Sequence, residues 1–266
     1  MAATSASARP RRRIVGVSTK MYFSAARTST YVSAVLDLLS APDALPSLND
    51  IDFFIIPDHV TISGVISQVR DTPSPLGRRV LVGAQDCHSE DSGAFTGEVS
   101  PAVLAEVGCA LVELGHAERR RLFGETDVSA AAKAKAVVRY RMIPLVCVGE
   151  VNAGEVSAAA EEVMVQVRSV LAAVEDEAEV VLAYEPVWAI GASQPAPVDH
   201  VCGVVRLIRE SEEVRVRNGL TRVVYGGSAG PGLYEKLAVE VDGLFLGRFA
   251  HDPKQFFQTL CEVAEA

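Results

Sequence analysis

The 266-residue sequence is short of paired cysteines, clustered histidines and basic charge, and each shortage excludes a class of protein. Its five cysteines are scattered and form no Cys-x-x-Cys, which indicates free thiols in a reducing compartment. The five histidines include no pair at helical ligand spacing, so the sequence predicts no metal site. Acidic residues outnumber basic ones by 34 to 25, which argues against nucleic acid as a partner.

Long apolar runs are also missing, since none approaches the ~20 residues that a membrane span requires. We therefore expect no membrane partner and a cytoplasmic location. The first thirteen residues are rich in Ser and Ala and then basic, with no apolar stretch that would indicate a secretory signal. They predict a disordered tail over 1–13, although an organellar transit peptide also fits this composition.

Short apolar runs alternate with longer amphipathic stretches through the remaining residues, 14–266, which we expect to form one domain. Most of the runs are continuously hydrophobic, which indicates parallel strands buried on both faces and joined by crossover helices. Eight such units in about 250 residues predict an α/β fold, the closed (β/α)₈ or TIM barrel. The expected strands are Ile14–Val17, Asp52–Ile56, Val80–Ala84, Ala110–Leu114, Ile143–Val148, Val180–Tyr184, Arg222–Tyr225 and Gly243–Leu246, and the clearest helices are Thr28–Leu39, Val128–Tyr140, Ala158–Val174 and Val198–Arg217.

A doubly wound open sheet is the alternative fold. When such a sheet binds a dinucleotide, it carries a glycine-rich turn after its first strand. Here the corresponding turn is Ser18–Met21, which contains no glycine. The barrel is therefore the favoured fold.

Polar residues and glycines follow six of the eight expected strands, at the end where a barrel forms its active site. They are Lys20, Gln85, His116, Glu185, Gly226–Ser228 and Gly247. Their gathering at one rim indicates an enzyme.

The most informative stretch is residues 181–191, Val-Leu-Ala-Tyr-Glu-Pro-Val-Trp-Ala-Ile-Gly. Its apolar strand ends at Glu185, and Pro186 prevents further strand pairing. The small-residue segment Ala189–Ala196 then has the composition of a lid. A base at a strand end followed by a lid suits proton abstraction in a closed site, although a strand-end glutamate alone is more often a surface residue.

Two further residues at this rim suit the same chemistry. Lys20 can serve as a fixed cation beside a phosphate and an oxyanion, or it can be an ordinary surface lysine. His116 precedes a helical pattern, and the positive end of a helix dipole favours a neutral imidazole that can donate to a carbonyl. A capping or packing histidine is the alternative.

The glycines near the end of the chain suit an anion. Gly226 and Gly227 precede Ser228 at the start of a helix, where backbone amides can approach a phosphate. Gly247 and Arg248 after the eighth strand offer one more amide and a guanidinium. A plain turn and a solvated arginine remain the alternatives.

These motifs together resemble the triosephosphate isomerase family over nearly the whole chain, from Ile14 to about Phe256. The matching stretches are Lys20–Met21, Gly83–Asp86, Gly93–Pro101, Leu114–Asp127, Cys147–Glu150, Ala183–Gly191, Tyr225–Ser228 and Asp242–Gly247.

The resemblance implies a cofactor-independent and metal-independent aldose–ketose isomerase of a small sugar phosphate that works through an enediolate. It implies that Glu185 is the base, His116 a neutral electrophile and Lys20 the electrostatic residue, with Glu118 as a supporting carboxylate. Phosphate would bind to the backbone amides of Gly191, Ser228 and Gly247.

The resemblance also implies a lid and a homodimer. The lid residues would be Val187, Trp188, Ala189, Ile190, Ala192 and Ser193. The loop over 85–98, with Gln85, Phe95, Thr96 and Glu98, would insert into a neighbouring subunit and bring Thr96 near the partner's active site.

The sequence departs from the family's usual pattern at several of these positions. Ser18 replaces an asparagine and leaves space beside the reacting carbons, and Arg248 replaces the second glycine of a pair. Ala117 replaces a serine, and Ser193 replaces a glycine of the lid. The trailing hinge is Gln194–Ala196, whose proline restricts its motion.

Ser18 together with Gly247 and Arg248 resembles the branch of the family that isomerises erythrulose phosphates in erythritol breakdown. We therefore predict a four-carbon substrate, L-erythrulose 1-phosphate. One alternative is a glycolytic triosephosphate isomerase, which interconverts dihydroxyacetone phosphate and glyceraldehyde 3-phosphate. A non-catalytic phosphosugar-binding barrel is a third reading, against which the intact Lys20, His116 and Glu185 argue.

Overall fold

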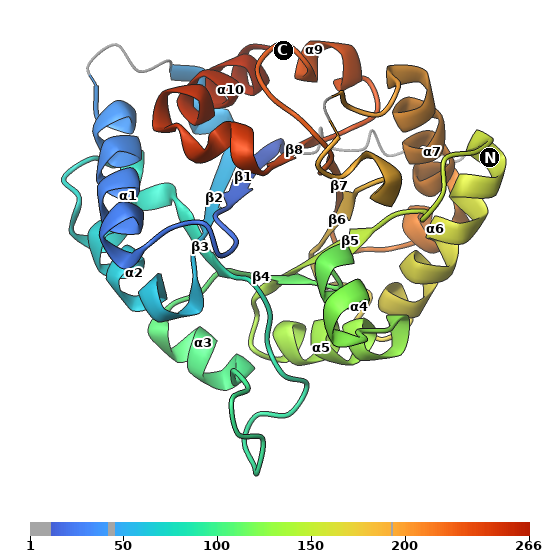
Figure 1. The fold of residues 1–266 in the computed structure, drawn as a ribbon, viewed down its shortest axis with the longest axis horizontal. Helices are drawn as coiled ribbons and strands as arrows, with labels where there is room; N and C mark the ends of the chain where they lie inside the picture. The colour runs from blue at the N-terminus through green and yellow to red at the C-terminus, as the bar shows by residue number, and fades with distance from the viewer. Residues whose placement is uncertain (1–11, 42–45, 193) are drawn as a thin grey trace, which may run out of the picture.

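Eight parallel strands close into a barrel in chain order, which confirms the predicted (β/α)₈ architecture (Figure 1). The computed structural model describes residues 12–41, 46–192 and 194–266. The strands agree with the predicted bounds to within one residue at either end. They are β1 (Ile14–Ser18), β2 (Asp52–Ile56), β3 (Leu81–Ala84), β4 (Leu111–Leu114), β5 (Ile143–Val148), β6 (Val180–Tyr184), β7 (Thr221–Tyr225) and β8 (Gly243–Leu246).

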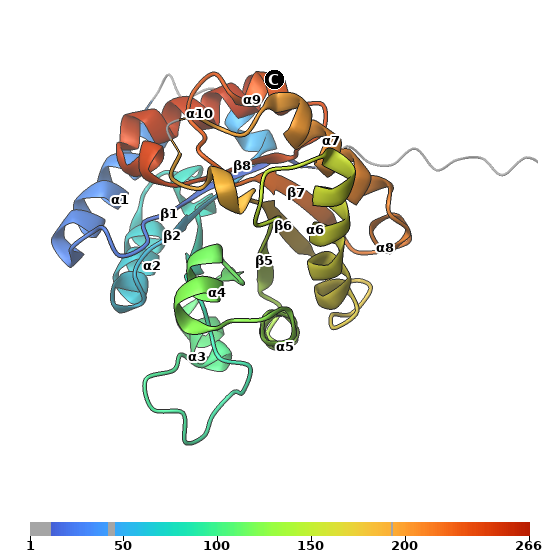
Figure 2. The same cartoon turned by 45° about the vertical axis from the view of Figure 1, so that its right-hand side comes forward.

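Helices surround the barrel on the outside (Figures 1 and 2). None in the part of the chain that the structure describes is both long and apolar enough to cross a membrane. The α-helices are α1 (Ala25–Leu39), α2 (Ile62–Asp71), α3 (Pro101–Val107), α4 (Ala117–Phe123), α5 (Asp127–Arg139), α6 (Val156–Leu171), α7 (Val198–Glu210), α8 (Glu212–Arg215), α9 (Tyr234–Leu237) and α10 (Pro253–Glu265). Short 3₁₀ turns add η1 (Pro46–Asp50), η2 (His59–Thr61), η3 (Gly77–Arg79), η4 (Val187–Ala189) and η5 (Arg248–His251).

The single helix expected over Val198–Arg217 is wrong, because the helix is interrupted at Ser211. The backbone of Ser211 is extended, with ψ of 147°. Its hydroxyl donates to the carbonyl of Ile208 at 2.7 Å, a local bond that competes with helical pairing. The chain therefore turns once between α7 and the short α8.

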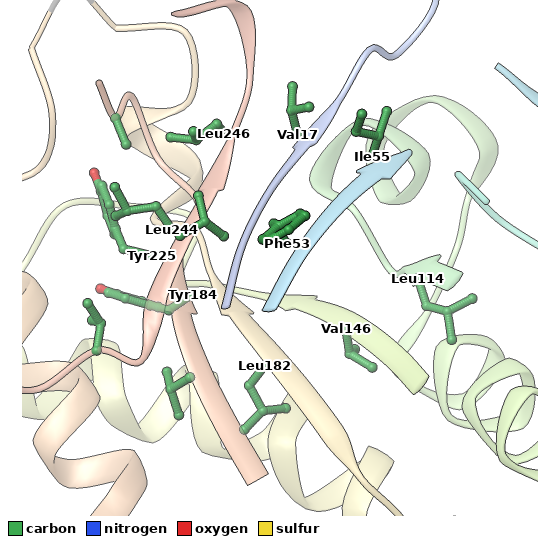
Figure 3. Packing of buried hydrophobic residues seen from close by; sticks show 14 of the residues in the cluster. Val17, Phe53, Ile55, Leu114, Val146, Leu182, Tyr184, Tyr225, Leu244 and Leu246 are labelled. Atoms are coloured by element: carbon green, nitrogen blue, oxygen red, sulfur yellow. The ribbon is translucent and has the colours of Figure 1, made fainter. Parts of the chain in front are cut away.

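Alternation along the strands divides the core into two layers. One set of side chains fills the barrel interior and includes Ile14, Phe54 and Leu145. The other set, among them Val17 and Phe53, packs between the barrel and its helices (Figure 3). Gly16 has no side chain because a Cβ there would lie 2.2 Å from the Phe54 ring.

The chain is already attached to the barrel before β1. Arg12 Nε donates to Asp52 Oδ1 at 2.6 Å, and an Arg13 guanidinium nitrogen donates to the carbonyl of Val263 at 2.8 Å. The expected tail over 1–13 thus includes two residues that contact the folded body. Its remaining residues, 1–11, lie outside the described part of the chain.

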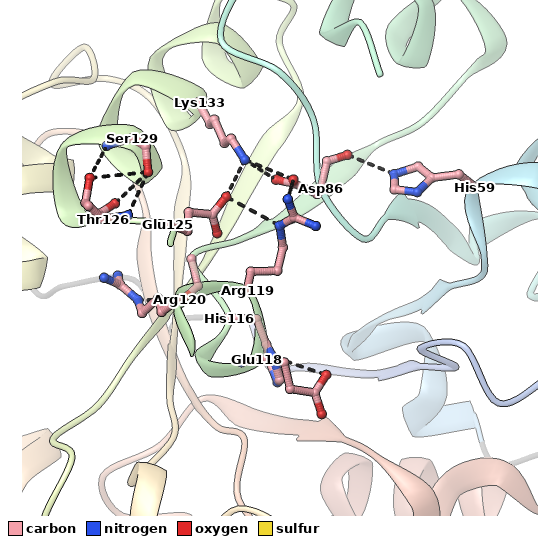
Figure 4. Close-up of polar contacts among 11 residues, drawn as sticks. His59, Asp86, His116, Glu118, Arg119, Arg120, Glu125, Thr126, Ser129 and Lys133 are labelled. Carbon is pink, nitrogen blue, oxygen red and sulfur yellow. Dashed lines mark hydrogen bonds and ion pairs between the residues drawn. The ribbon is translucent and has the colours of Figure 1, made fainter. Parts of the chain in front are cut away.

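The long segment between β3 and α3 projects from the barrel (Figures 1 and 2). A buried ion network attaches its base to α4 and α5 (Figure 4). Lys133 Nζ donates to both oxygens of Asp86, at 2.8 and 2.9 Å, and also pairs with Glu125. An Arg119 guanidinium nitrogen lies 2.7 Å from Asp86. The projecting loop therefore begins from a fixed position.

Candidate active site

A cavity of about 720 Å³ opens at the carboxyl ends of the strands. The structure brings together there nearly every residue that the sequence suggested for catalysis and phosphate binding. The lining includes Ser18, Lys20, His116, Glu118, Glu185, Ile190, Gly191, Ala192, Ser228, Gly247 and Arg248.

Lys20 is the cation at one side of this cavity. It has a left-handed backbone with φ of 47°, and Gln85 Nε2 donates to its carbonyl at 2.8 Å. Lys20 Nζ donates to Glu118 Oε1 at 2.8 Å. Burial opposes its charge, but the hydrogen bond and charge of Glu118, together with the charges of Glu185 and Glu113, outweigh burial and raise the pKa of Lys20 above its usual value. The ammonium is therefore both positioned and charged.

His116 begins α4, where its ring accepts a backbone hydrogen bond. Nδ1 accepts from the N–H of Glu118 at 3.1 Å, which leaves the ring proton on Nε2. Burial, assisted by the charge of Lys20, lowers the pKa of His116 to about 4. Its Nε2 lies 3.4 Å from Glu185 Oε2. A neutral imidazole thus presents an N–H beside the buried carboxyl.

Glu185 follows β6 and is almost fully buried, with 4% of its surface exposed. Two glycines make room for it: a Cβ on Gly226 would lie 2.4 Å from Glu185 Oε1, and one on Gly149 would lie 1.9 Å from its carbonyl oxygen. Burial and the nearby charge of Glu113 raise the pKa of Glu185 well above its usual value, against the opposing charge of Lys20. This carboxyl is positioned and basic enough to take a proton from carbon.

Glu113 is a residue that the sequence interpretation missed. It lies on β4 two residues after Leu111, so it points into the barrel interior, and it is 3% exposed. Burial raises the pKa of Glu113 to about 7, although the charge of Lys20 and the Ser18 side chain oppose this shift. A charged residue within the apolar run 110–114 was the available signal.

A second residue that the sequence interpretation missed, Glu150, contacts the start of the segment predicted to form a lid. Its carboxylate accepts hydrogen bonds from Trp188 Nε1 at 2.8 Å and from the Tyr184 hydroxyl at 3.1 Å. His200 Nε2 lies 3.0 Å from the same carboxylate. Of the predicted lid residues, Val187–Ala189 form η4 beside this cluster, whereas Ile190 and Ala192 line the cavity.

The far end of the lid contacts the loop after β7. Ser228 Oγ donates to the carbonyl of Ala192 at 3.0 Å. The Tyr225 hydroxyl accepts a hydrogen bond from the N–H of Ala196 at 3.1 Å. The intervening lid residue Ser193 lies outside the described residues.

The residues predicted for subunit contact lie apart from the cavity of their own chain. Gln85 contacts Lys20 from outside the cavity lining, whereas Phe95, Thr96 and Glu98 are exposed on the projecting loop. The Phe95 ring packs on His88 with centroids 4.1 Å apart, which shapes the loop from within.

Comparisons with known proteins match this geometry. A family model described as triosephosphate isomerase matches residues 13–264. The chain belongs to the triosephosphate isomerase family. Membership confirms the resemblance inferred from the sequence and, with it, an isomerase that acts on a sugar phosphate.

Several relatives in this family carry one printed name, L-erythrulose-1-phosphate isomerase. That of Pectobacterium atrosepticum is 42% identical over 92% of this chain and 93% of its own. That of Rhizobium meliloti is 39% identical over 95% of this chain and 97% of its own. That of Brucella abortus is 37% identical over 94% of this chain and 96% of its own.

The structure also bears on whether the chain could hold a metal ion. Across residues 12–41, 46–192 and 194–266, no group of three or more His, Cys, Asp or Glu side chains is arranged to hold a metal ion.

We predict that His116 stays neutral throughout the physiological pH range. Because its pKa is lowered to about 4, the ring becomes charged only as the pH falls through that value. The ¹⁵N spectrum of histidine-labelled protein, with the signal assigned by His116→Gln, should show a neutral ring protonated at Nε2 at about pH 6. An imidazolium signal at that pH would contradict the description of the site.

Proposed function

We propose that the chain isomerises L-erythrulose 1-phosphate through an enediolate, with Glu185 as the base. The observation that supports this substrate most strongly is that Ser18 and the pair Gly247–Arg248 line the same cavity and follow neighbouring strands. β1 and β8 pair with Val17 opposite Leu246, so the residues that follow them lie side by side. The printed names of the relatives support the same substrate.

The roles follow from the geometry and charge of the site. Glu185 removes the proton from the carbon beside the carbonyl. The Nε2–H of His116 and the ammonium of Lys20 stabilise the negative oxygen that develops, and Glu118 keeps Lys20 in position. Glu185 then returns the proton to the neighbouring carbon, so the reaction needs neither an oxidant nor a cofactor.

The position of the phosphate decides which proton is removed. In L-erythrulose 1-phosphate the carbonyl is at C2 and the phosphate is on C1. The proton that must be removed for isomerisation is therefore the one on C3, the carbon on the other side of the carbonyl. Its removal and the return of a proton to C2, together with transfer of the C3 hydroxyl proton to the oxygen on C2 by way of His116, move the carbonyl to C3, which is C2 of erythrulose 4-phosphate. With dihydroxyacetone phosphate, the same steps give an aldehyde.

We propose that the phosphate binds where the lid meets the loops after β7 and β8. Gly191, Ser228 and Gly247 offer backbone amides to the cavity, and Arg248 adds a positive charge at its edge. This local charge matters because the chain as a whole carries −9. Lid closure over residues 187–196 would exclude water and protect the enediolate from phosphate elimination.

The cytoplasm is the proposed location, supported by the state of the cysteines. All five are free thiols, and Cys87, Cys109 and Cys147 are buried. Free thiols of this kind are typical of proteins in a reducing compartment.

The substrate prediction is tested by initial rates on L-erythrulose 1-phosphate and dihydroxyacetone phosphate, measured side by side without added metal. We expect the higher kcat/KM for the tetrulose, with erythrulose 4-phosphate as the product. A preference of more than about 100-fold for the triose would contradict the proposal and support a triosephosphate isomerase in its place.

We further propose that two copies of the chain form a homodimer through the projecting loop. The buried network at Asp86 fixes the base of the loop, and its tip presents Phe95 and Thr96 to solvent. Other large apolar side chains are exposed as well, with Met21 at 90% and Phe123 at 69%. Such residues on a single chain suit burial against a partner.

The dimer is tested by sedimentation of the wild type and of Thr96→Arg. The wild type should sediment at twice 28.3 kDa, and the variant should dissociate because an added charge would be buried in the interface. Thr30→Arg, at an exposed threonine on α1, is the matched control. A wild type that remains monomeric at micromolar concentration would contradict the proposal.

A further inference from the structure

Two neighbouring polar side chains, one that lines the cavity and one that is buried away from it, have incomplete hydrogen bonding. The Ser18 hydroxyl and Glu113 Oε2 are both buried without a partner among the described residues. They face each other closely enough for the Ser18 hydroxyl to stabilise the charged form of the Glu113 carboxyl and lower its pKa as a weak hydrogen bond does, although no well-formed bond joins them. An unpaired polar atom in a protein interior is costly, so this arrangement requires a reason.

Glu113 is the more unusual of the two because it is a charged residue at an inward-facing strand position with apolar strand neighbours. Its register partner on β5 is Leu145, and Leu111 precedes it on the same face of β4. An apolar residue would fit this interior position at lower cost. The carboxyl is therefore better explained by what it does at the cavity than by what it contributes to the fold.

The reacting groups interact electrostatically with this pair. The charge of Lys20 lowers the pKa of Glu113, and the charge of Glu113 raises the pKa of Glu185. Ser18 lines the cavity above the carboxyl, whereas Glu113 does not. A substrate carbon next to the one that Glu185 deprotonates would therefore come close to Ser18, with Glu113 behind it.

We propose that Glu113 is a specificity-determining residue which, together with Ser18, binds the terminal hydroxyl of a four-carbon sugar phosphate. This inference rests on the proposed function. In L-erythrulose 1-phosphate the carbon that loses its proton carries a hydroxymethyl group, which dihydroxyacetone phosphate lacks. The hydroxyl of that group bonds to Ser18, which lines the cavity, and Ser18 in turn donates to Glu113, so the substrate completes the hydrogen bonds that are incomplete without it.

This arrangement discriminates because the triose leaves the polar pair unsatisfied. Sites built to hydrogen-bond a substrate hydroxyl reject the analogue without it much more strongly than apolar pockets reject a missing methylene. Ser18 leaves space for the extra hydroxymethyl group, and Glu113 makes this part of the site polar. The two residues thus act as one recognition element.

The test measures the selectivity ratio, which is kcat/KM for L-erythrulose 1-phosphate divided by kcat/KM for dihydroxyacetone phosphate. We expect Glu113→Leu to lower this ratio by about 100-fold or more at about pH 8. Glu113→Gln keeps an acceptor and a donor of similar size and should lower the ratio much less. Inhibition by phosphoglycolate, which has no fourth carbon, checks that each variant keeps the rest of the site.

Each outcome decides a separate point. A merely structural role for Glu113 lowers both kcat/KM values together and leaves the ratio unchanged, which would overturn this inference alone. A wild-type ratio that favours the triose by more than about 100-fold overturns the proposed function and this inference with it. A fall in the ratio for Glu113→Leu, with the ratio largely kept in Glu113→Gln, supports the recognition of the terminal hydroxyl.

Discussion

A carboxyl buried at the end of β6 is the constraint on which the rest of the site depends. Glu185 is almost fully buried, so its pKa is raised well above that of a surface glutamate. Its position requires glycine at 149 and 226, because any side chain there would occupy the space of Glu185 itself. A base of this strength, close to a fixed ammonium and a neutral imidazole, suits the removal of a proton from carbon.

The barrel provides these conditions through one periodic pattern. Inward positions of the strands are apolar at the amino end, as at Ile14 and Phe54, and become polar toward the carboxyl end, as at Ser18 and Glu113. The apolar layer excludes water from below the site, so the charges above it act in a medium of low polarity. The same burial that lowers the pKa of His116 raises that of Glu185, whose Oε2 lies 3.4 Å from the His116 Nε2.

Much of this arrangement could be predicted from the sequence, because parallel strands that are buried on both faces are easily recognised. The carboxyl ends of such strands meet at one rim, so Lys20, His116 and Glu185 could be placed together without coordinates. Glu113 could not be recognised in this way, because its proposed role depends on which face of β4 it occupies and on which residues it faces across the barrel. Ser211 ended a predicted helix through one local hydrogen bond, which periodicity does not reveal.

The central claim is that Glu185 acts as the base from a fixed position, and Glu185→Asp tests it most directly. Removing one methylene withdraws the carboxyl from the substrate carbon without changing its charge. The account predicts that kcat falls about 100-fold, while the inhibition constant of phosphoglycolate changes little, because the phosphate contacts lie elsewhere. Turnover equal to that of the wild type would contradict the account and assign the proton transfer to another group.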